Sequence, residues 1–207
     1  MIEIPYGLKQ ALESGQCVLF IGSGIGKNMF DEYGCNAPTG IELAKSIVEK
    51  FTPGIDCSDL AKVSQYVEIK NKSRIELETY IKQIFSKMKP DDIYKWIPTV
   101  RWKAIYTTNY DNCLQQAFDS CSKPALEPHY ITYNQNLMDF DPRFQVPIYY
   151  LHGSLFIDED PHIILTERDY TKYAEKRKMM FEQLKYHFAT SNILYIGYSN
   201  NDSNWKQ

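Results

Sequence analysis

The stretch that decides the fold is Cys17-Val-Leu-Phe-Ile21, which runs directly into Gly22-Ser-Gly-Ile-Gly26. A continuous apolar run bounded by glycines is typical of a strand buried on both faces, as in a parallel sheet. Glycines after such a strand permit positive φ angles and let backbone N–H groups approach a phosphate closely. The spacing matches neither a Walker A loop nor a dehydrogenase fingerprint. The stretch therefore predicts either a phosphate-binding turn or a plain strand-to-helix turn.

Three further apolar strands are expected along the chain, each followed by polar or small residues. They are residues 103–107 before Thr108-Asn109-Tyr110-Asp111, residues 147–151 before His152-Gly153-Ser154, and residues 192–196 before Gly197-Tyr198-Ser199. A shorter β-rich piece spans 129–133, and helical stretches are expected at 5–14, 112–118 and 170–189. Alternation of apolar strands and helices predicts an α/β fold with a parallel sheet. Ligands bind outside the carboxyl ends of such strands, so the polar residues should share one edge.

The stretch after the first strand is expected to be helical. Thr39-Gly-Ile-Glu42 and Ser73-Arg-Ile-Glu76 both match a capping box, in which side chains satisfy the free N–H groups of a helix start. Apolar residues recur at helical spacing between and after these boxes. We therefore expect one domain over residues 1–207 with a helical insertion at about 39–100.

Composition narrows the class of protein. The chain has 207 residues, 43% of them hydrophobic, and a formal net charge of −3. These are the proportions of a soluble globular domain, without the basic patch of a nucleic-acid-binding protein. No apolar run is long enough to span a membrane, and no secretion signal is present. Five cysteines without CxxC spacing predict reduced thiols, a cytoplasmic location and no metal site.

Two groups of polar residues are candidates for chemistry. Asn109 and Asp111 could orient a sugar or a water, although Asp111 could equally cap the helix that follows. His152 ends a strand and precedes a glycine, which suits a general base near neutral pH but also a structural histidine. Ser199 could donate a hydrogen bond to a phosphate or lie in a simple turn.

Taken together, these motifs resemble the sirtuin-like superfamily. The resemblance rests on GSGIG at 22–26, TTNYD at 107–111, LHGS at 151–154 and IGYSNND at 196–202. It is closest to the prokaryotic branch found in antiviral (antiphage) defence proteins, which the segment LTERDY at 165–170 also resembles. The resemblance implies a Rossmann-like NAD-binding sheet with helices on both faces and a helical module inserted after the first strand.

The resemblance also assigns roles to residues. It implies that His152 is the catalytic histidine and that Asn109 and Asp111 lie at the nicotinamide ribose. The residues it implies for binding NAD are Gly22, Ser23, Gly24, Gly26, Thr108, Gly197 and Ser199.

The function implied is hydrolysis of NAD to nicotinamide and ADP-ribose as an effector of antiphage defence. NAD is then the substrate, and a further domain or partner subunit would sense phage, with a homo-oligomer expected. A protein deacylase is the alternative, but residues 155–191 contain no cysteine for the zinc module of those enzymes. A non-catalytic NAD or ADP-ribose sensor and a domain without a ligand stay open. The family's last strand should follow Ser199, so the chain is expected to be a piece of a longer protein.

Overall fold

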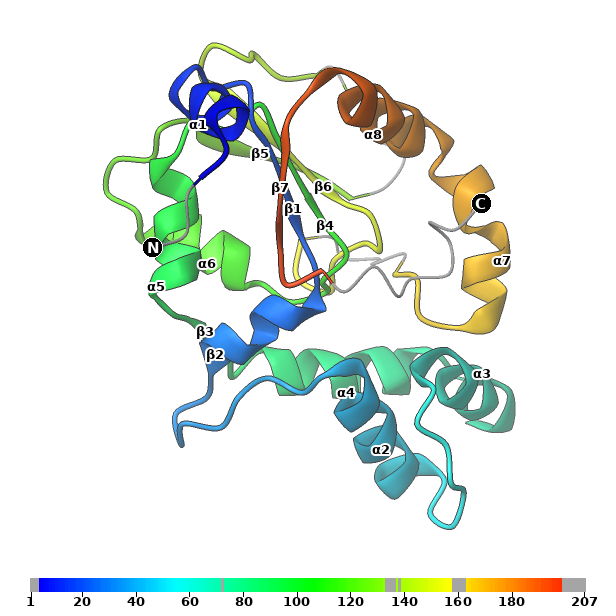
Figure 1. The fold of residues 1–207 in the computed structure, drawn as a ribbon. Helices are drawn as coiled ribbons and strands as arrows, with labels where there is room; N and C mark the ends of the chain where they lie inside the picture. The colour runs from blue at the N-terminus through cyan, green and yellow to red at the C-terminus, as the bar shows by residue number, and fades with distance from the viewer. Residues whose placement is uncertain (1–3, 72, 133–136, 138, 158–162, 199–207) are drawn as a thin grey trace.

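A five-stranded parallel sheet forms the centre of the computed structural model, which describes residues 4–71, 73–132, 137, 139–157 and 163–198. Its strand order is β5-β6-β4-β1-β7, and each neighbouring pair is parallel. The strands are β1 (Val18–Ile21), β4 (Ala104–Thr107), β5 (Glu127–Ile131), β6 (Gln145–Tyr150) and β7 (Ile193–Ile196). The predicted parallel α/β architecture is confirmed (Figure 1).

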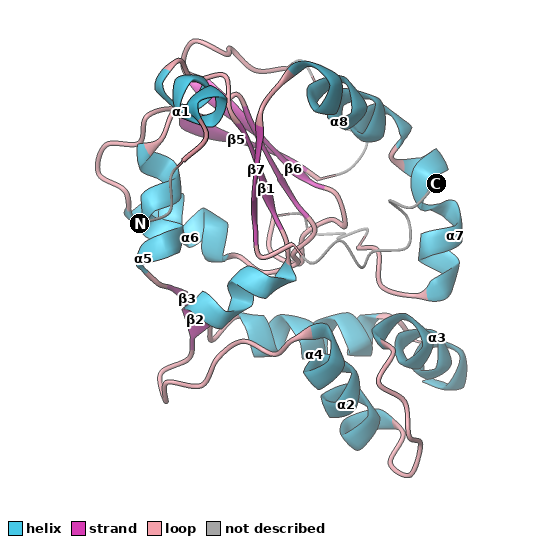
Figure 2. Cartoon of the chain, in the orientation of Figure 1, coloured by secondary structure: helices cyan, strands magenta, loops and turns pink. Residues whose placement is uncertain are grey.

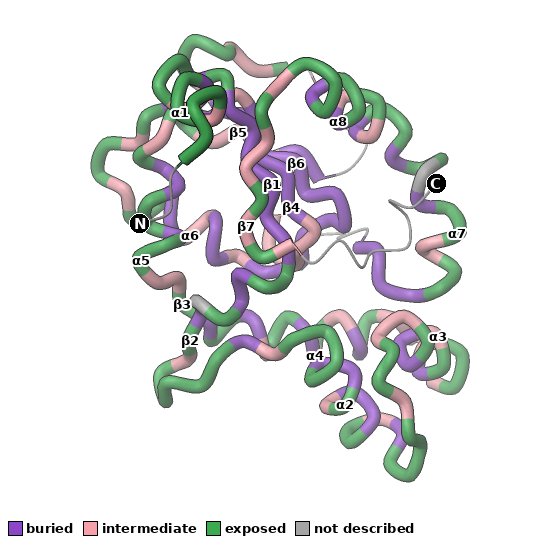
Figure 3. Tube along the Cα trace, viewed as in Figure 1, coloured by how far each residue is buried: buried purple, intermediate pink, exposed green. Residues whose placement is uncertain are grey.

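Helices cover both faces of this sheet (Figure 2). The elements on one side are α1 (Tyr6–Glu13), α5 (Asp92–Trp96), η2 (Ile97–Thr99) and α6 (Cys113–Ser120), and on the other α7 (Glu167–Lys176) and α8 (Lys178–Thr190). Alternate residues of β1 point to two separate cores, Leu19 and Ile21 to one and Val18 and Phe20 to the other. All four are buried, as the continuous apolar run predicts for a central strand (Figure 3).

Three helices form a separate layer across the carboxyl edge of the sheet (Figure 1). They are α2 (Gly40–Phe51), α3 (Leu60–Asn71) and α4 (Ile75–Phe85), and we call them the helical module. The module follows the short helix η1 (Ser23–Asn28) and the strand β2 (Met29–Phe30), which pairs with β3 (Lys89–Pro90).

The two expected capping boxes have different outcomes. The box at the start of α2 is confirmed, because Thr39 accepts from the Glu42 N–H and Glu42 accepts from the Thr39 N–H. The box expected at Ser73 is wrong. Helix α4 begins at Ile75 with Arg74 as its N-cap, so Glu76 is one residue too early for the reciprocal bond.

The single helix expected over 170–189 is also wrong, because two helices occupy this stretch. The chain leaves helical geometry at Arg177 (φ −121°, ψ 25°), which separates α7 from α8. Arg177 is buried, and its guanidinium donates to the carbonyl of Thr132. Among the residues that the structure describes, no helix has the length and apolarity needed to cross a membrane.

Candidate active site

The register of the sheet aligns the ends of the four strands that precede the predicted motifs. Ile21 at the end of β1 lies opposite Thr107 of β4 and Ile196 of β7, and Thr107 lies opposite Tyr150 of β6. The residues that follow these four strand ends therefore meet at the carboxyl edge of the sheet. This is the edge at which open α/β sheets bind ligands.

The glycine loop is shaped by close backbone packing. None of its three glycines has a positive φ, so the left-handed geometry that glycine permits is not used there. A Cβ atom on Gly22 or Gly24 would lie 2.7 Å from the carbonyl oxygen of Gly197. The Gly24 N–H donates to that same oxygen at 2.7 Å, and the Gly22 N–H donates to Ile196 at 2.9 Å. These two N–H groups hold the loop against the end of β7.

A cavity of about 610 Å³ lies between the sheet edge and the helical module. Its volume is in the range of pockets that bind cofactors and small ligands. On the sheet wall it is lined by residues from all four strand-end motifs, namely Ser23, Gly26, Thr108, Asn109, Tyr110, Asp111, His152, Gly197 and Tyr198. Gly22 and Gly24 support this wall without lining it, and Ser199 lies outside the described residues.

Asn109 projects from the end of β4 toward the glycine loop. Its backbone N–H donates to Thr107 Oγ1 at 3.1 Å, and its Nδ2 donates to the Gly22 carbonyl at 3.4 Å. Its Oδ1 is buried and accepts no hydrogen bond from the described part of the chain. A buried amide oxygen without a donor is costly, which suits a residue that awaits a ligand hydroxyl or a water.

Asp111 is buried beside the start of α6. Its Oδ1 accepts the Cys113 N–H at 2.9 Å, so it does help to cap that helix. Burial raises the pKa of Asp111 to about 6, against hydrogen bonds from the Cys113 and Asp111 N–H groups and from Asn109. No lysine or arginine in the described residues forms an ion pair with it. Burial and this carboxylate raise the pKa values of Tyr94 and Tyr150.

His152 is held among three tyrosine rings. Its ring centroid lies 5.3 Å from Tyr173, 5.7 Å from Tyr170 and 6.2 Å from Tyr110. Its backbone carbonyl accepts the Ile164 N–H at 2.8 Å. The next residue, Gly153, has φ +78°, which explains the glycine after the histidine.

Sequence reasoning missed the opposite, helical wall of the cavity. It is formed by Pro38, Gly40, Leu43, Asp59, Leu60, Ala61 and Phe85 near the helical module, and by Glu167, Tyr170 and Thr171 of α7. The LTERDY stretch at 165–170 contains Glu167 and Tyr170 of this wall, and the Thr166–Asp169 spacing is a second signal, a capping box that marks the start of α7.

The cavity lining is acidic in the part of the chain that the structure describes. Asp59, Asp111 and Glu167 contribute carboxylates, and no lysine or arginine lines it. A phosphate here would have no cationic partner among these lining residues, and the Gly22 and Gly24 N–H groups already donate to the end of β7. A ligand with a cationic part would gain from the carboxylates.

Fold and site together define a Rossmann-like domain with a nucleotide-sized cavity at the carboxyl ends of its strands. A family model described as the SIR2-like domain matches residues 103–207, and the chain belongs to this family. The chain is also 25% identical over 199 residues to the NAD(+) hydrolase ThsA of Acinetobacter baumannii (strain 532279). The match covers 93% of this chain and 38% of that protein, so the chain spans well under half of its length. The resemblance inferred from the motifs is confirmed.

Proposed function

We propose that this domain hydrolyses NAD to nicotinamide and ADP-ribose. The observation that carries the proposal is that one cavity of about 610 Å³ is lined by residues from the glycine loop, the TTNYD motif, the HGS motif and the end of β7. The similarity to the NAD(+) hydrolase ThsA supports NAD as the substrate.

We propose the following placement of the substrate. The pyrophosphate lies against the glycine loop at Ser23 and Gly26, both of which line the cavity. Asn109 Oδ1 receives a ribose hydroxyl or the attacking water. The nicotinamide end, which carries the positive charge, lies toward Asp111 and His152.

The reaction breaks the bond between ribose C1′ and the nicotinamide nitrogen. The bonding electrons leave with the nitrogen, so cationic NAD releases neutral nicotinamide and an oxocarbenium-like ribose. A water adds to C1′ and gives ADP-ribose and a proton, which His152 accepts as general base. The ionised carboxylate of Asp111 stabilises the positive charge that develops on the ribose.

The test is nicotinamide release by the purified full-length protein and two variants. We expect His152→Ala and Asn109→Ala each to lower turnover about a hundredfold or more while the protein stays folded. The matched control is His129→Ala, which removes a histidine from β5 that does not line the cavity. Full activity in both site variants would overturn the assignment.

The same assay separates the other candidate activities. Release that requires an acylated peptide would indicate a deacylase, and tight NAD binding without turnover would indicate a sensor. We further propose that the activity serves antiphage defence by depleting NAD, under the control of a further domain or partner subunit and within a homo-oligomer. NAD levels in infected cells carrying the wild type or His152→Ala test this role.

A further inference from the structure

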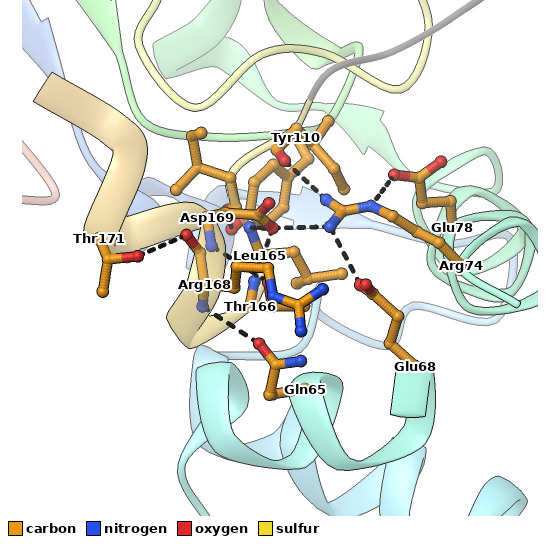
Figure 4. A network of polar contacts seen from close by, with 12 residues as sticks. Gln65, Glu68, Arg74, Glu78, Tyr110, Leu165, Thr166, Arg168, Asp169 and Thr171 are labelled. Carbon is orange, nitrogen blue, oxygen red and sulfur yellow. Dashed lines mark hydrogen bonds and ion pairs between the residues drawn. The ribbon is translucent and has the colours of Figure 1, made fainter. Parts of the chain in front are cut away.

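A cluster of charges connects the helical module to the segment before α7, outside the cavity (Figure 4). At its centre Arg74, the N-cap of α4, makes four contacts with two parts of the molecule. Within the module its Nε donates to Glu78 at 2.6 Å, and its Nη1 contacts Glu68 at 3.3 Å. Outside the module, Nη1 donates to Asp169 at 2.7 Å, and Nη2 donates to the Ile163 carbonyl at 2.6 Å.

Asp169 connects Arg74 to the backbone at the start of α7. Its Oδ2, which accepts from Arg74, also accepts the backbone N–H groups of Leu165 at 3.1 Å and Thr166 at 2.9 Å. One carboxylate oxygen therefore ties Arg74 to the turn that leads into the helix. A second link runs parallel, because Gln65 of α3 accepts the Arg168 N–H at 3.1 Å (Figure 4).

The segment held by Arg74 is also bonded to the candidate catalytic residue. The Ile164 N–H donates to the His152 carbonyl, and the Ile164 carbonyl accepts the Tyr110 hydroxyl at 2.7 Å. The next turns of the chain carry Tyr170 and Tyr173, whose rings pack against His152. Arg74 is therefore connected to His152 in two ways. One connection is the backbone of Ile163 and Ile164, and the other is the pair of α7 tyrosines whose rings pack against His152.

The chemistry of the cluster requires an arginine. Three carboxylates and a carbonyl surround it in different directions, and only the planar guanidinium fork can donate to all of them. Burial alone would lower the pKa of Arg74, but the bonds to Glu78 and Asp169 outweigh it and raise that pKa. Without the cation, three half-buried carboxylates would repel one another, which would weaken the contact between the module and α7.

We propose that Arg74 is a positioning residue for NAD cleavage: it fixes the segment 163–169, and through Ile164 and the α7 tyrosines it orients His152. The inference rests on the proposed function. Arg74 does not line the cavity, so it acts through other residues. Its loss should therefore affect the chemical step more than the binding of NAD.

The test compares the wild-type full-length protein with Arg74→Ala and Arg74→Lys. We expect Arg74→Ala to lower kcat about tenfold or more, with KM changed by less than about threefold, because a small displacement of a catalytic group is costly. Arg74→Lys keeps the charge but loses the fork, so its kcat should lie between the two. Hydrogen exchange in the Arg74→Ala variant should quicken over residues 163–176 while the sheet strands stay protected.

Arg143→Ala is the matched control, because Arg143 forms an exposed ion pair with Asp141 and lies outside the cavity. It should match the wild type in kcat and in exchange. The proposal is overturned if Arg74→Ala keeps wild-type kcat, if its activity falls only in proportion to the unfolded fraction, or if exchange quickens equally in the sheet. Failure of the proposed function would instead show as no nicotinamide release by the wild type.

Discussion

The two walls of the cavity are built by different physical means. The sheet wall is fixed by backbone contacts, such as the Gly24 N–H on the Gly197 carbonyl and the level ends of four strands. The helical wall is fixed by side chains, with Arg74 bridging α4 and the segment before α7. The candidate site residues therefore lie on a wall held by backbone contacts, while the helical wall depends on a few charges.

The electrostatics of the two walls also differ. Burial by itself would raise the pKa of both Asp111 on the sheet wall and Asp169 behind the helical wall. Around Asp169 the backbone N–H of Thr166 and the Arg74 guanidinium more than offset burial, so its pKa is lowered. Asp111 has no such cation among the described residues, and its pKa is raised. Among the described residues, the buried carboxylate of Asp111 thus lies on the sheet wall without a cation to offset its burial.

The backbone packing of the sheet wall gives the largest expected effect. A Cβ atom in Gly197→Ala would collide with the backbone nitrogen of Ile25 and lie 2.7 Å from the Gly24 carbonyl carbon, at a φ of +66°. We expect a loss of about 2–5 kcal/mol in the free energy of unfolding and loss of NAD cleavage. Urea denaturation and nicotinamide release measure the two.

The control for this change is Gly34→Ala. Gly34 has a similar φ of +79°, but nothing lies within 4 Å of the added methyl group. It should therefore cost only the left-handed strain, about 1–2 kcal/mol, and leave activity unchanged. Equal losses in both variants would show that contact between the glycine loop and β7 does not fix the sheet wall.

The sheet wall was largely predictable from the sequence, and the helical wall was not. Strand ends carry local signals, and parallel pairing brings His152 and Asn109 to one edge whatever the details of packing. The close packing of the glycines was not predictable, because their contact with Gly197 joins residues about 170 positions apart and has no local signature. Arg74 was equally invisible, since its partner Asp169 is 95 residues away and its own position suggested only a helix start.

The pH dependence of stability provides the second prediction. The pKa of Asp111 is about 6 in the native state, above the value near 3.9 in an unfolded chain. The native state therefore binds this proton more tightly, and the cost of the buried carboxylate disappears as pH falls from about 6 to about 4. Relative to Asp111→Asn, the wild type should gain about 2 kcal/mol between pH 8 and pH 4. Urea denaturation of both proteins across this range measures the gain.

Other titrating groups affect both proteins equally, so their contributions cancel in the difference between the wild type and Asp111→Asn. Burial also lowers the pKa of His187 to about 4, which destabilises both proteins as pH falls. Tyr94, Cys113 and Tyr150 face Asp111 but have raised pKa values and stay neutral over this range. Asp169→Asn is the matched control, for which the expected effect has the opposite sign. The native pKa of Asp169 is lowered, so the wild type should lose stability relative to this variant as pH falls. A difference independent of pH for Asp111→Asn would contradict the prediction.

The smallest expected effect compares two capping boxes of nearly equal geometry. Thr166 Oγ1 accepts the Asp169 N–H at 3.2 Å, and Thr39 Oγ1 accepts the Glu42 N–H at 3.3 Å. Replacing either threonine by alanine should lower the free energy of unfolding by about 1 kcal/mol. Thr166→Ala should in addition lower kcat about threefold, because its box holds the segment that contacts His152. Thr39→Ala should not change kcat, since its box holds α2, which carries no contact to His152 among those described.

Because Thr166 is buried and Thr39 is exposed, the kcat of each variant is compared after allowing for its own measured loss of stability. If kcat follows stability alone, the two variants will behave alike, and the cover over the cavity is then a passive layer whose parts are interchangeable. If only Thr166→Ala loses turnover, the segment 163–169 transmits the position of the helical wall to the candidate catalytic histidine. The same energy removed from two helix starts would then have different consequences, because only one of them is bonded through Ile164 to the sheet wall.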